Sequence, residues 1–564
     1  MGGRGPSWKS LINNIQHVQN LIWNLSVSQE TCIEEAVQLS LALQRADVMT
    51  YRLQELFIRG QYMLKETIVT LLPSIPQLRK LTIALKDRKE PPVLDAIPLQ
   101  IIIKNLVQLK ELRLLKNARI MIDEVFNSND TPNNSVVTYS PPSLPLMPSK
   151  ESVNPSLSLR TLDFGKMGVT ARQIIEISPW FPKVQSLKLD SISLFDSMAY
   201  YPNGKTGCLE FAKDFSSAWP HLRNLTLYLE GPIKFLKVAS PTDASIFVRD
   251  IATVLAPRLR ILDLPTAIMD DNVFDMMSQV FGTTIEDPHR GVSATTNRQS
   301  LLLAIPLDNM SHFEQLSLNG YNQGVYSKLD SGRALFRFLE SCTTLKVLDI
   351  GSLHIGSTIL DRPTDVNAIA DNGSEGIDSQ GPRQASYYFL SHAGWACKNL
   401  QYIHLNGAHT VNCIPVQLYK YSENLELGRA LFRQLSKLTQ LRFLWLQGFL
   451  LGTELEKSGF HQLATLKELK VVLVDFYWIH RGTDTYRLRD LSHDTIIEFL
   501  GKGDIRWMVQ SWPKLRFLNL GGPCVSGCNR KPKMQKWLDE CAGPGRSVSL
   551  KEGYSIYPKE YRLE

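Results

Sequence analysis

The sequence predicts an α/β solenoid, with short parallel strands on a concave side and helices on a convex side. Three observations support this fold class. One pattern, apolar-x-x-apolar-x-apolar, recurs along nearly the whole chain of 564 residues. The closest copies stand 25 residues apart, as from Leu53 to Leu78. Segments between the copies carry apolar residues at helical spacing, so strand and helix are expected to alternate.

The repeated pattern defines the strands. A single copy is weak evidence, because any amphipathic segment with several leucines can produce it, but fourteen copies along one chain define a repeat. Their spacing falls in the range of roughly 20–29 residues that is typical of leucine-rich repeats. The copies begin at Val18, Leu53, Leu78, Leu109, Leu159, Val184, Leu222, Leu259, Phe313, Leu345, Leu400, Leu441, Leu466 and Leu515.

Each copy predicts a short strand in its last apolar-x-apolar portion, where side chains alternate between the core and the concave surface. Residues 332–344 and 428–440 both begin with "GRALFR" and place apolar residues three and four positions apart. They predict helices on the convex side. One repeat cannot bury its own apolar face, so we expect stability to come from the stacking of neighbouring repeats in a curved horseshoe.

The repeats predict one solenoid over residues 1–523, followed by a C-terminal cap or tail at 524–564. The stretch "KMQKWLDECA" predicts a short helix in that cap. Three stretches rich in Ser, Pro, Asn, Gly or charge are predicted to be disordered insertions: 127–158, 283–299 and 361–386. The pattern resumes after each of them, so they are not predicted to separate domains.

Composition narrows the function classes. The chain has 62 Lys and Arg against 55 Asp and Glu, a net charge of +7, and no long basic block. A nucleic-acid partner is therefore allowed but not indicated. Eight scattered cysteines indicate reduced thiols and a cytoplasmic or nuclear protein. The first residues contain no signal-peptide core, Pro6 replaces the Ser or Thr of a myristoylation motif, and apolar runs are too short for a membrane span.

The repeats resemble the ribonuclease-inhibitor-like leucine-rich repeats, especially the irregular repeats of F-box proteins that are numerous in fungi. The resemblance covers Val18 to Leu520. It implies a substrate-recognition subunit of a cullin-based, SCF-type ubiquitin ligase, with the ligase adaptor as a further partner. No F-box precedes Val18, so either the protein works without one or the sequence lacks that segment. The Asn that follows the strand in regular repeats is mostly missing, which favours irregular turns.

Two stretches of the sequence suggest other chemistry. "CVSGC" with Cys524 and Cys528, and Cys541 downstream, is a loose zinc pattern without an assigned fourth ligand. The aromatic and basic cluster at 474–490 suggests nucleic-acid stacking, or simply a loop. Motifs for hydrolysis or phosphate binding are absent from the sequence. We therefore expect a non-enzymatic protein without cofactor or metal that is monomeric outside a complex. The alternative is a nucleic-acid-associated or enzymatic factor that uses the solenoid as its structural frame.

Residues between the buried positions of each strand are expected to face the concave surface, where they either bind a protein partner or form an ordinary solvated strand face. Recurring aspartates on the middle strands favour a basic or polar partner segment. "LRFLWLQG" at 441–448 and "LRFLNLGG" at 515–522 differ chiefly at one such position. There Trp445 is predicted to stand exposed as a binding anchor, so Trp445→Ala should leave folding nearly intact. The predicted partner-binding residues are Trp445, His404, Lys470, Tyr228, Asp163, Asp263, Asp349, Arg59 and Asn519.

Overall fold

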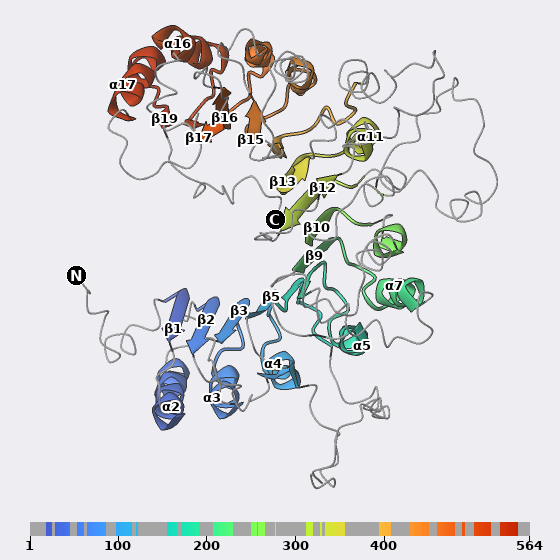
Figure 1. The fold of residues 1–564 in the computed structure, drawn as a ribbon. Coiled ribbons are helices and arrows are strands. Elements are labelled where there is room, and N and C mark those ends of the chain that lie inside the picture. Colours follow the sequence, from blue (N-terminus) through green and yellow to red (C-terminus); the bar gives the residue numbers. More distant parts are fainter. Residues whose placement is uncertain are drawn as a thin grey trace, which may run out of the picture. The chain divides into compact units, whose positions relative to one another are not determined.

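The fold is described by a computed structural model of the chain (Figure 1). It forms two compact units, each of which is described by itself: unit 1, Met1–Glu230 with Leu236–Ala239, and unit 2, Gly231–Phe235 with Ser240–Glu564. The described residues are 18–24, 29–45, 53–60, 65–85, 97–115, 120–121, 155–165, 169, 171–190, 207–228, 250–255, 258–265, 277, 312–319, 328–329, 333–355, 394–407, 429–450, 459–479, 488–490, 501–519 and 531–550.

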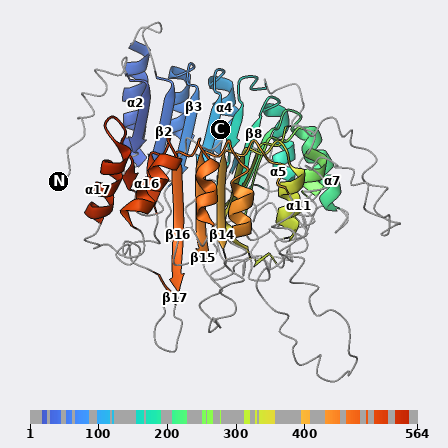
Figure 2. The same cartoon turned by 90° about the horizontal axis from the view of Figure 1, so that it is seen from above.

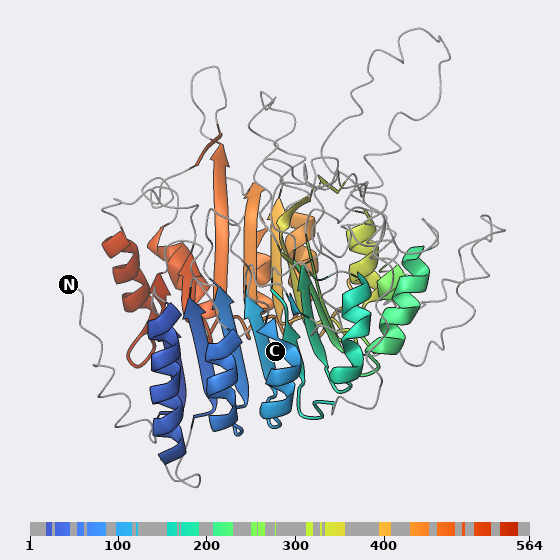
Figure 3. The same ribbon diagram turned by 90° about the horizontal axis from the view of Figure 1, so that it is seen from below.

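Unit 1 is a parallel sheet whose strands pair in chain order, with helices on one side of it (Figures 1 and 3). Its strands are β1 (Asn20–Asn24), β2 (Glu55–Gly60), β3 (Lys80–Leu85), β5 (Glu111–Leu115), β7 (Thr161–Asp163), β8 (Ser186–Asp190) and β9 (Asn224–Tyr228). Its helices are α2 (Gln29–Arg45), α3 (Lys65–Leu71), η2 (Leu72–Ser74), α4 (Leu99–Asn105), α5 (Ala171–Glu176), η3 (Ser178–Trp180) and α7 (Gly207–Ala218). A separate short pair joins β4 (Ile97–Pro98) to β6 (Ile120–Met121).

Unit 2 repeats the arrangement with a second run of parallel strands. These are β10 (Ile261–Pro265), β11 (Gln315–Asn319), β13 (Val347–Ile355), β14 (Tyr402–Gly407), β15 (Phe443–Leu450), β16 (Val471–Ile479), β18 (Phe517–Asn519) and β19 (Ser549–Leu550). Strand β12 (Lys328–Leu329) pairs in parallel with the end of β13, whereas β17 (Leu488–Asp490) runs antiparallel to the end of the long β16 (Figure 2). The helices are α11 (Arg333–Ser341), η11 (Phe460–Thr465), α16 (Lys502–Ser511) and α17 (Lys531–Ala542), with further helical turns at 250–255 and 429–435.

The core lies between strands and helices and is built from the repeated apolar residues. Leu56, Leu81 and Leu112 stand opposite one another on β2, β3 and β5, and all three are buried. On β1, the Trp23 Nε1–H donates to Glu35 of α2 at 3.2 Å, which identifies the helix-facing side of the strand. The fold class predicted from the sequence, an α/β leucine-rich-repeat solenoid with parallel strands alternating with helices, is therefore confirmed.

The strand pairing corrects one repeat. On β16, Val472 and Val474 stand opposite Leu444 and Leu446, so the true copy begins at Leu469 and not at Leu466. The predicted copy was three residues early because "LKELKV" and "LKVVLV" both fit the pattern. Lys470 consequently precedes the strand, and its carbonyl accepts hydrogen bonds from the N–H groups of Arg516 and Phe517 at 2.8 and 3.1 Å.

Part of the first predicted insertion is packed. Its last residues, 155–158, are described: the Ser156 N–H donates to the Trp180 carbonyl at 2.8 Å, and the Ser158 hydroxyl donates to the Val107 and Leu109 carbonyls at 2.7 and 2.8 Å. These bonds hold the chain as it enters β7. Residues 127–154 and the other two predicted insertions lie outside the described residues.

The C-terminal region contains the predicted helix and one strand that was not predicted. Helix α17 packs on α16, and β19 pairs with β18. The Gln535 side chain joins α17 to β19. Its Nε2 donates to the Val548 carbonyl and its Oε1 accepts from the Leu550 N–H, both at 2.8 Å. Residues 531–550 therefore extend the sheet of unit 2 by a strand. Within the described residues, no helix has both the length and the apolar character that a membrane crossing requires.

Candidate functional site

Each sheet has an inner face, defined here as the side opposite the helices and the repeated apolar residues. Side chains alternate along a strand, so every second residue belongs to this face. Unit 1 and unit 2 each have such a face, and the sequence predicts partner binding on both. The two faces differ in solvent exposure, and this difference decides which one is the candidate site.

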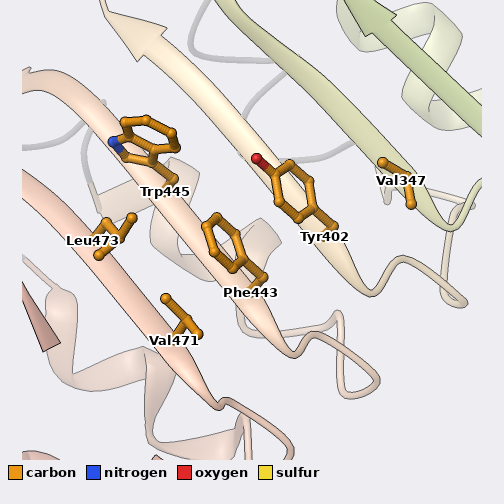
Figure 4. Close-up of a cluster of buried hydrophobic side chains, with 6 residues drawn as sticks. All are labelled: Val347, Tyr402, Phe443, Trp445, Val471 and Leu473. Atoms are coloured by element: carbon orange, nitrogen blue, oxygen red, sulfur yellow. The ribbon is translucent and has the colours of Figure 1, made fainter. Parts of the chain in front are cut away.

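The unit 2 inner face is apolar and buried. Its central side chains project from the same side of β13, β14, β15 and β16 (Figure 4). Across the strands, the rings of Tyr402 and Phe443 stack with centroids 4.3 Å apart and planes 12° from parallel. The cluster consists of Val347, Tyr402, Phe443, Trp445, Val471 and Leu473, with Phe517 packed against it. These strands therefore have buried apolar residues on both faces.

A row of polar and aromatic groups crosses the same face. Asp349, His404 and Trp445 stand opposite one another on β13, β14 and β15. Nδ1 of His404 lies 2.8 Å from Oδ1 of Asp349, and its ring stacks on the Trp445 indole with centroids 3.8 Å apart and planes 4° from parallel. Gly351 makes room for the imidazole, because a Cβ added there would overlap the ring. A buried, hydrogen-bonded histidine of this kind stabilises one arrangement of the strands.

The prediction that Trp445 stands exposed is wrong. Trp445 lies on the predicted face of β15, but only 2% of its surface is exposed, and His404 is as deeply buried. The error has a physical reason: alternation identifies the face that a side chain joins, but not whether that face is covered. Trp445 is part of a packed cluster, so its truncation is expected to destabilise the chain.

The remaining predicted residues of unit 2 are also poor candidates for contact with a partner. Asp349 and Asn519 are buried on the inner face, and Asp263 on β10 is half-buried. Lys470 does not belong to the inner face, because the corrected register gives that position to Leu473. The predicted role of these residues in binding remains a prediction that their burial does not favour.

The unit 1 inner face, in contrast, reaches solvent at β1 and β2 and through its longer charged side chains, whereas Thr82, Asp163 and Thr226 on the same face are buried. On β1, Ile22 is 70% exposed, although it is flanked by the buried Leu21 and Trp23. On β2, the neighbouring Phe57 is half-buried and Arg59 is exposed, as predicted for Arg59. Ile22 stands directly opposite Phe57 in the strand pairing. This end of the sheet therefore presents an accessible apolar pair beside a cation.

Charged side chains continue across unit 1. Arg113, Asp163 and Lys188 stand opposite one another on β5, β7 and β8. Asp163 is buried, its Oδ1 accepts the Gly165 N–H at 2.8 Å, and its Oδ2 lies 4.0 Å from Nζ of Lys188. Burial raises the pKa of Asp163 above its ordinary value of 3.8, since attraction to Lys188, the Gly165 hydrogen bond and attraction to Arg113 offset only part of the desolvation.

A second group of charges lies nearer the start of the strands. Lys80 on β3 lies 3.9 Å from Glu55 and 3.6 Å from Glu111, and Arg113 forms an ion pair with Glu111. The side chain of Arg113 is 37% exposed, whereas Asp163 is almost completely covered. Of the aspartates predicted to tilt the concave face toward acid, Asp163 and Asp349 are buried and Asp263 is half-buried. The cations of unit 1, in contrast, reach solvent.

Two useful residues were missed by the sequence reasoning. Ile22 is the fifth residue of the first copy, "VQNLIW", as Trp445 is the fifth of its own copy, so the same alternation could have found it. Lys80 lies on the inner face one residue before Leu81, whereas the predicted positions lie between the buried residues of each strand or just after them. Tyr228, one of the predicted partner-binding residues, ends β9, where its backbone stands opposite Asp190.

The alternative chemistries receive no support from the described side chains. Cys524 and Cys528 lie outside the described residues, and Cys541 is half-buried on α17. In the described part of the chain, His, Cys, Asp and Glu residues do not gather in threes that could hold a metal ion. Burial raises the pKa of both Cys342 and Cys397 to about 12, so these two thiols stay protonated at neutral pH.

Comparison with known proteins adds little to this geometry. No protein-family model matches the sequence, and no curated protein is similar to it. Among solved structures, the chain is similar to a structural-genomics target from Bacteroides fragilis, at 13% sequence identity and a TM-score of 0.33. The match covers 59% of this chain and 74% of the other.

Proposed function

We propose that this chain is a non-enzymatic scaffold that binds a protein partner on the inner face of unit 1. The observation that carries the proposal is the contrast between the two inner faces: Ile22 is 70% exposed, whereas Trp445 is 2% exposed. An exposed apolar side chain beside charged groups on a rigid sheet is the arrangement that protein interfaces use. Strands paired along their length hold these side chains in fixed positions, which lowers the entropy lost on binding.

The site has an apolar end and a positively charged part, and a polypeptide can contact both. Ile22 and Phe57 form the apolar end, where a side chain of the partner would be desolvated. Arg59, Arg113 and Lys188 supply the polar part along the neighbouring strands. A partner that lies across the strands would contact both, so apolar burial supplies affinity and the charges select the partner.

The narrower version of this function is a substrate receptor for a cullin-based ubiquitin ligase. It is supported by the resemblance of the repeats to those of F-box proteins. Co-purification of the adaptor with the full chain, and its loss when residues 1–50 are deleted, is the expected result. If the adaptor is not recovered, even with an extended amino terminus, the scaffold function stands without the ligase.

A neutral substitution tests the binding face directly. Ile22→Gln removes apolar contact area without adding charge, and we expect about a tenfold loss of partner affinity. Val107→Gln is the matched control, because Val107 is 63% exposed but lies in the turn between α4 and β5. The measurement is quantitative mass spectrometry of proteins that co-purify with the wild-type chain and with each variant, followed by titration of the purified partner.

The expected pattern is a protein retained by wild type and Val107→Gln and lost with Ile22→Gln, while both variants melt within a few degrees of wild type. Equal retention by all three chains would contradict the proposed face. Binding of RNA with a steep salt dependence, unaffected by Ile22→Gln, would instead favour the nucleic-acid alternative.

A further inference from the structure

The charges on the unit 1 inner face are not equally available to a partner. The two carboxylates nearest its centre are engaged by groups of this chain: Asp163 accepts from the Gly165 N–H and faces Lys188, and Glu111 pairs with Arg113 and Lys80. Their side chains are 6% and 21% exposed. These two acidic groups are therefore mostly covered and contact the neighbouring cations.

Arg113 and Lys188 extend further into solvent than the acids they contact. Lys80 does not, because the side chain of Glu55 beside it is 50% exposed. The side chains of Lys80, Arg113 and Lys188 are between 28% and 37% exposed, and Arg59 is exposed on β2. Long Lys and Arg side chains bury their stems and leave the charged end in water. Arg113 and Lys188 are separated by one strand, β7, which places their backbones about 10 Å apart. The charged side chains of this face that reach solvent are thus four spaced cations and one exposed carboxylate, that of Glu55.

We infer that the partner presents an acidic segment to this face, with carboxylates near Arg59, Arg113 and Lys188 and an apolar residue against Ile22 and Phe57. This inference rests on the proposed function and specifies the chemistry of the partner. It differs from the expectation from sequence, in which the recurring aspartates favour a basic or polar partner segment. Charge complementarity of this kind selects a partner and speeds its association.

A polypeptide fits this face better than a nucleic acid. Glu55 is half-exposed on β2 and lies 3.9 Å from Lys80, so carboxylates interrupt the positive surface. A continuous phosphate backbone would meet these carboxylates, whereas a peptide can place its acidic residues only where the cations stand. The exposed Ile22 also gives a phosphate backbone nothing to bind.

Selection of short random peptides displayed on phage, with the full-length chain as bait, tests the inference. Peptides that require the inner face are recognised by their loss with Ile22→Gln and their retention with Val107→Gln. We expect this set to be rich in Asp and Glu. Synthetic versions should bind roughly tenfold more weakly to Arg59→Glu and Arg113→Glu. Lys104→Glu is the charge-matched control, since Lys104 is exposed on α4, on the helix side of the sheet.

The two variants serve different purposes. Arg113→Glu places a negative charge near Glu111 and Asp163, so the fold of this variant must be checked by circular dichroism. Arg59→Glu changes an exposed residue, so the test remains interpretable if Arg113→Glu unfolds. Selected peptides that are neutral or basic, but still lost with Ile22→Gln, would overturn the acidic partner and leave the scaffold function intact. Selected peptides that bind Ile22→Gln as well as wild type would overturn both the acidic partner and the proposed binding face. RNA binding lost with Arg59→Glu, without peptide selection, would assign the face to nucleic acid.

Discussion

Trp445 shows how a single residue can be placed on the correct face and still be misjudged. Alternation along "LRFLWLQG" puts Leu444 and Leu446 in the core and Trp445 on the other side, and the structure agrees. The burial of that other side depends on residues far away in the sequence. No pattern local to β15 reports it, although Phe443 and Tyr402 beside it indicate an aromatic surface.

Truncation of Trp445 is therefore expected to destabilise the protein. Trp445→Ala removes the indole from its stack on His404 and leaves a cavity in the unit 2 cluster, which should lower the free energy of unfolding by about 3–5 kcal/mol. Ile22→Ala is the matched control on the exposed inner face and should change it by about 0.5 kcal/mol or less. Urea unfolding followed by circular dichroism measures both, and equal effects would mean that Trp445 is not packed.

At the scale of elements, the sequence pattern predicts most of the strands, but it does not always predict the residue at which a repeat begins. The leucines that turn the chain into β2, β3 and β5 are separated by similar lengths of helix and turn, so the pattern alone aligns them. At β16 two overlapping matches compete, and only the pairing of Val472 with Leu444 decides between them. Strand β19 was missed because its single buried leucine, Leu550, gives no repeat pattern.

Cross-strand ion pairs at the start of the unit 2 strands give an element-scale prediction. Glu314 accepts from Lys346 Nζ and Arg260 Nε, both at 2.7 Å. Partial burial acts to raise the pKa of Glu314, but these two cations outweigh it and hold the pKa below its ordinary value of 4.5. Glu314→Gln should therefore lower the free energy of unfolding by about 1 kcal/mol at neutral pH, after allowance for solvent screening.

The pH dependence has a definite sign. Because the pKa of Glu314 is lower in the folded chain, its stabilisation is complete at neutral pH and is lost as the pH falls below 4.5. The difference between wild type and Glu314→Gln should therefore shrink toward acid. Urea unfolding at several pH values measures this difference. Glu468→Gln, which loses the exposed ion pair with Lys514, is the control, and its effect should be more sensitive to salt. A difference that grows toward acid would contradict the assignment.

At the scale of the whole molecule, the repeat pattern predicted the fold class because every repeat obeys the same rule: buried apolar residues toward the helices and variable residues on the inner face. The candidate site was less predictable. Arg59, expected on the concave face, is exposed; Ile22 was not among the predicted residues; and Asp163 and Asp349, expected to face a partner, are buried. Exposure on an inner face depends on what covers it, which is a property of the assembled chain and not of one repeat.

Hydroxyl-radical footprinting of the full chain, free and bound to its partner, tests the central claim most directly. Indole and aliphatic side chains react only when solvent reaches them. In the free chain we predict oxidation at Ile22 and protection of Trp445; on binding, Ile22 and Phe57 should become protected, with no change at Val107. Strong oxidation of Trp445 in the free chain, followed by its protection on binding with Ile22 unchanged, would contradict the account and return the binding site to unit 2.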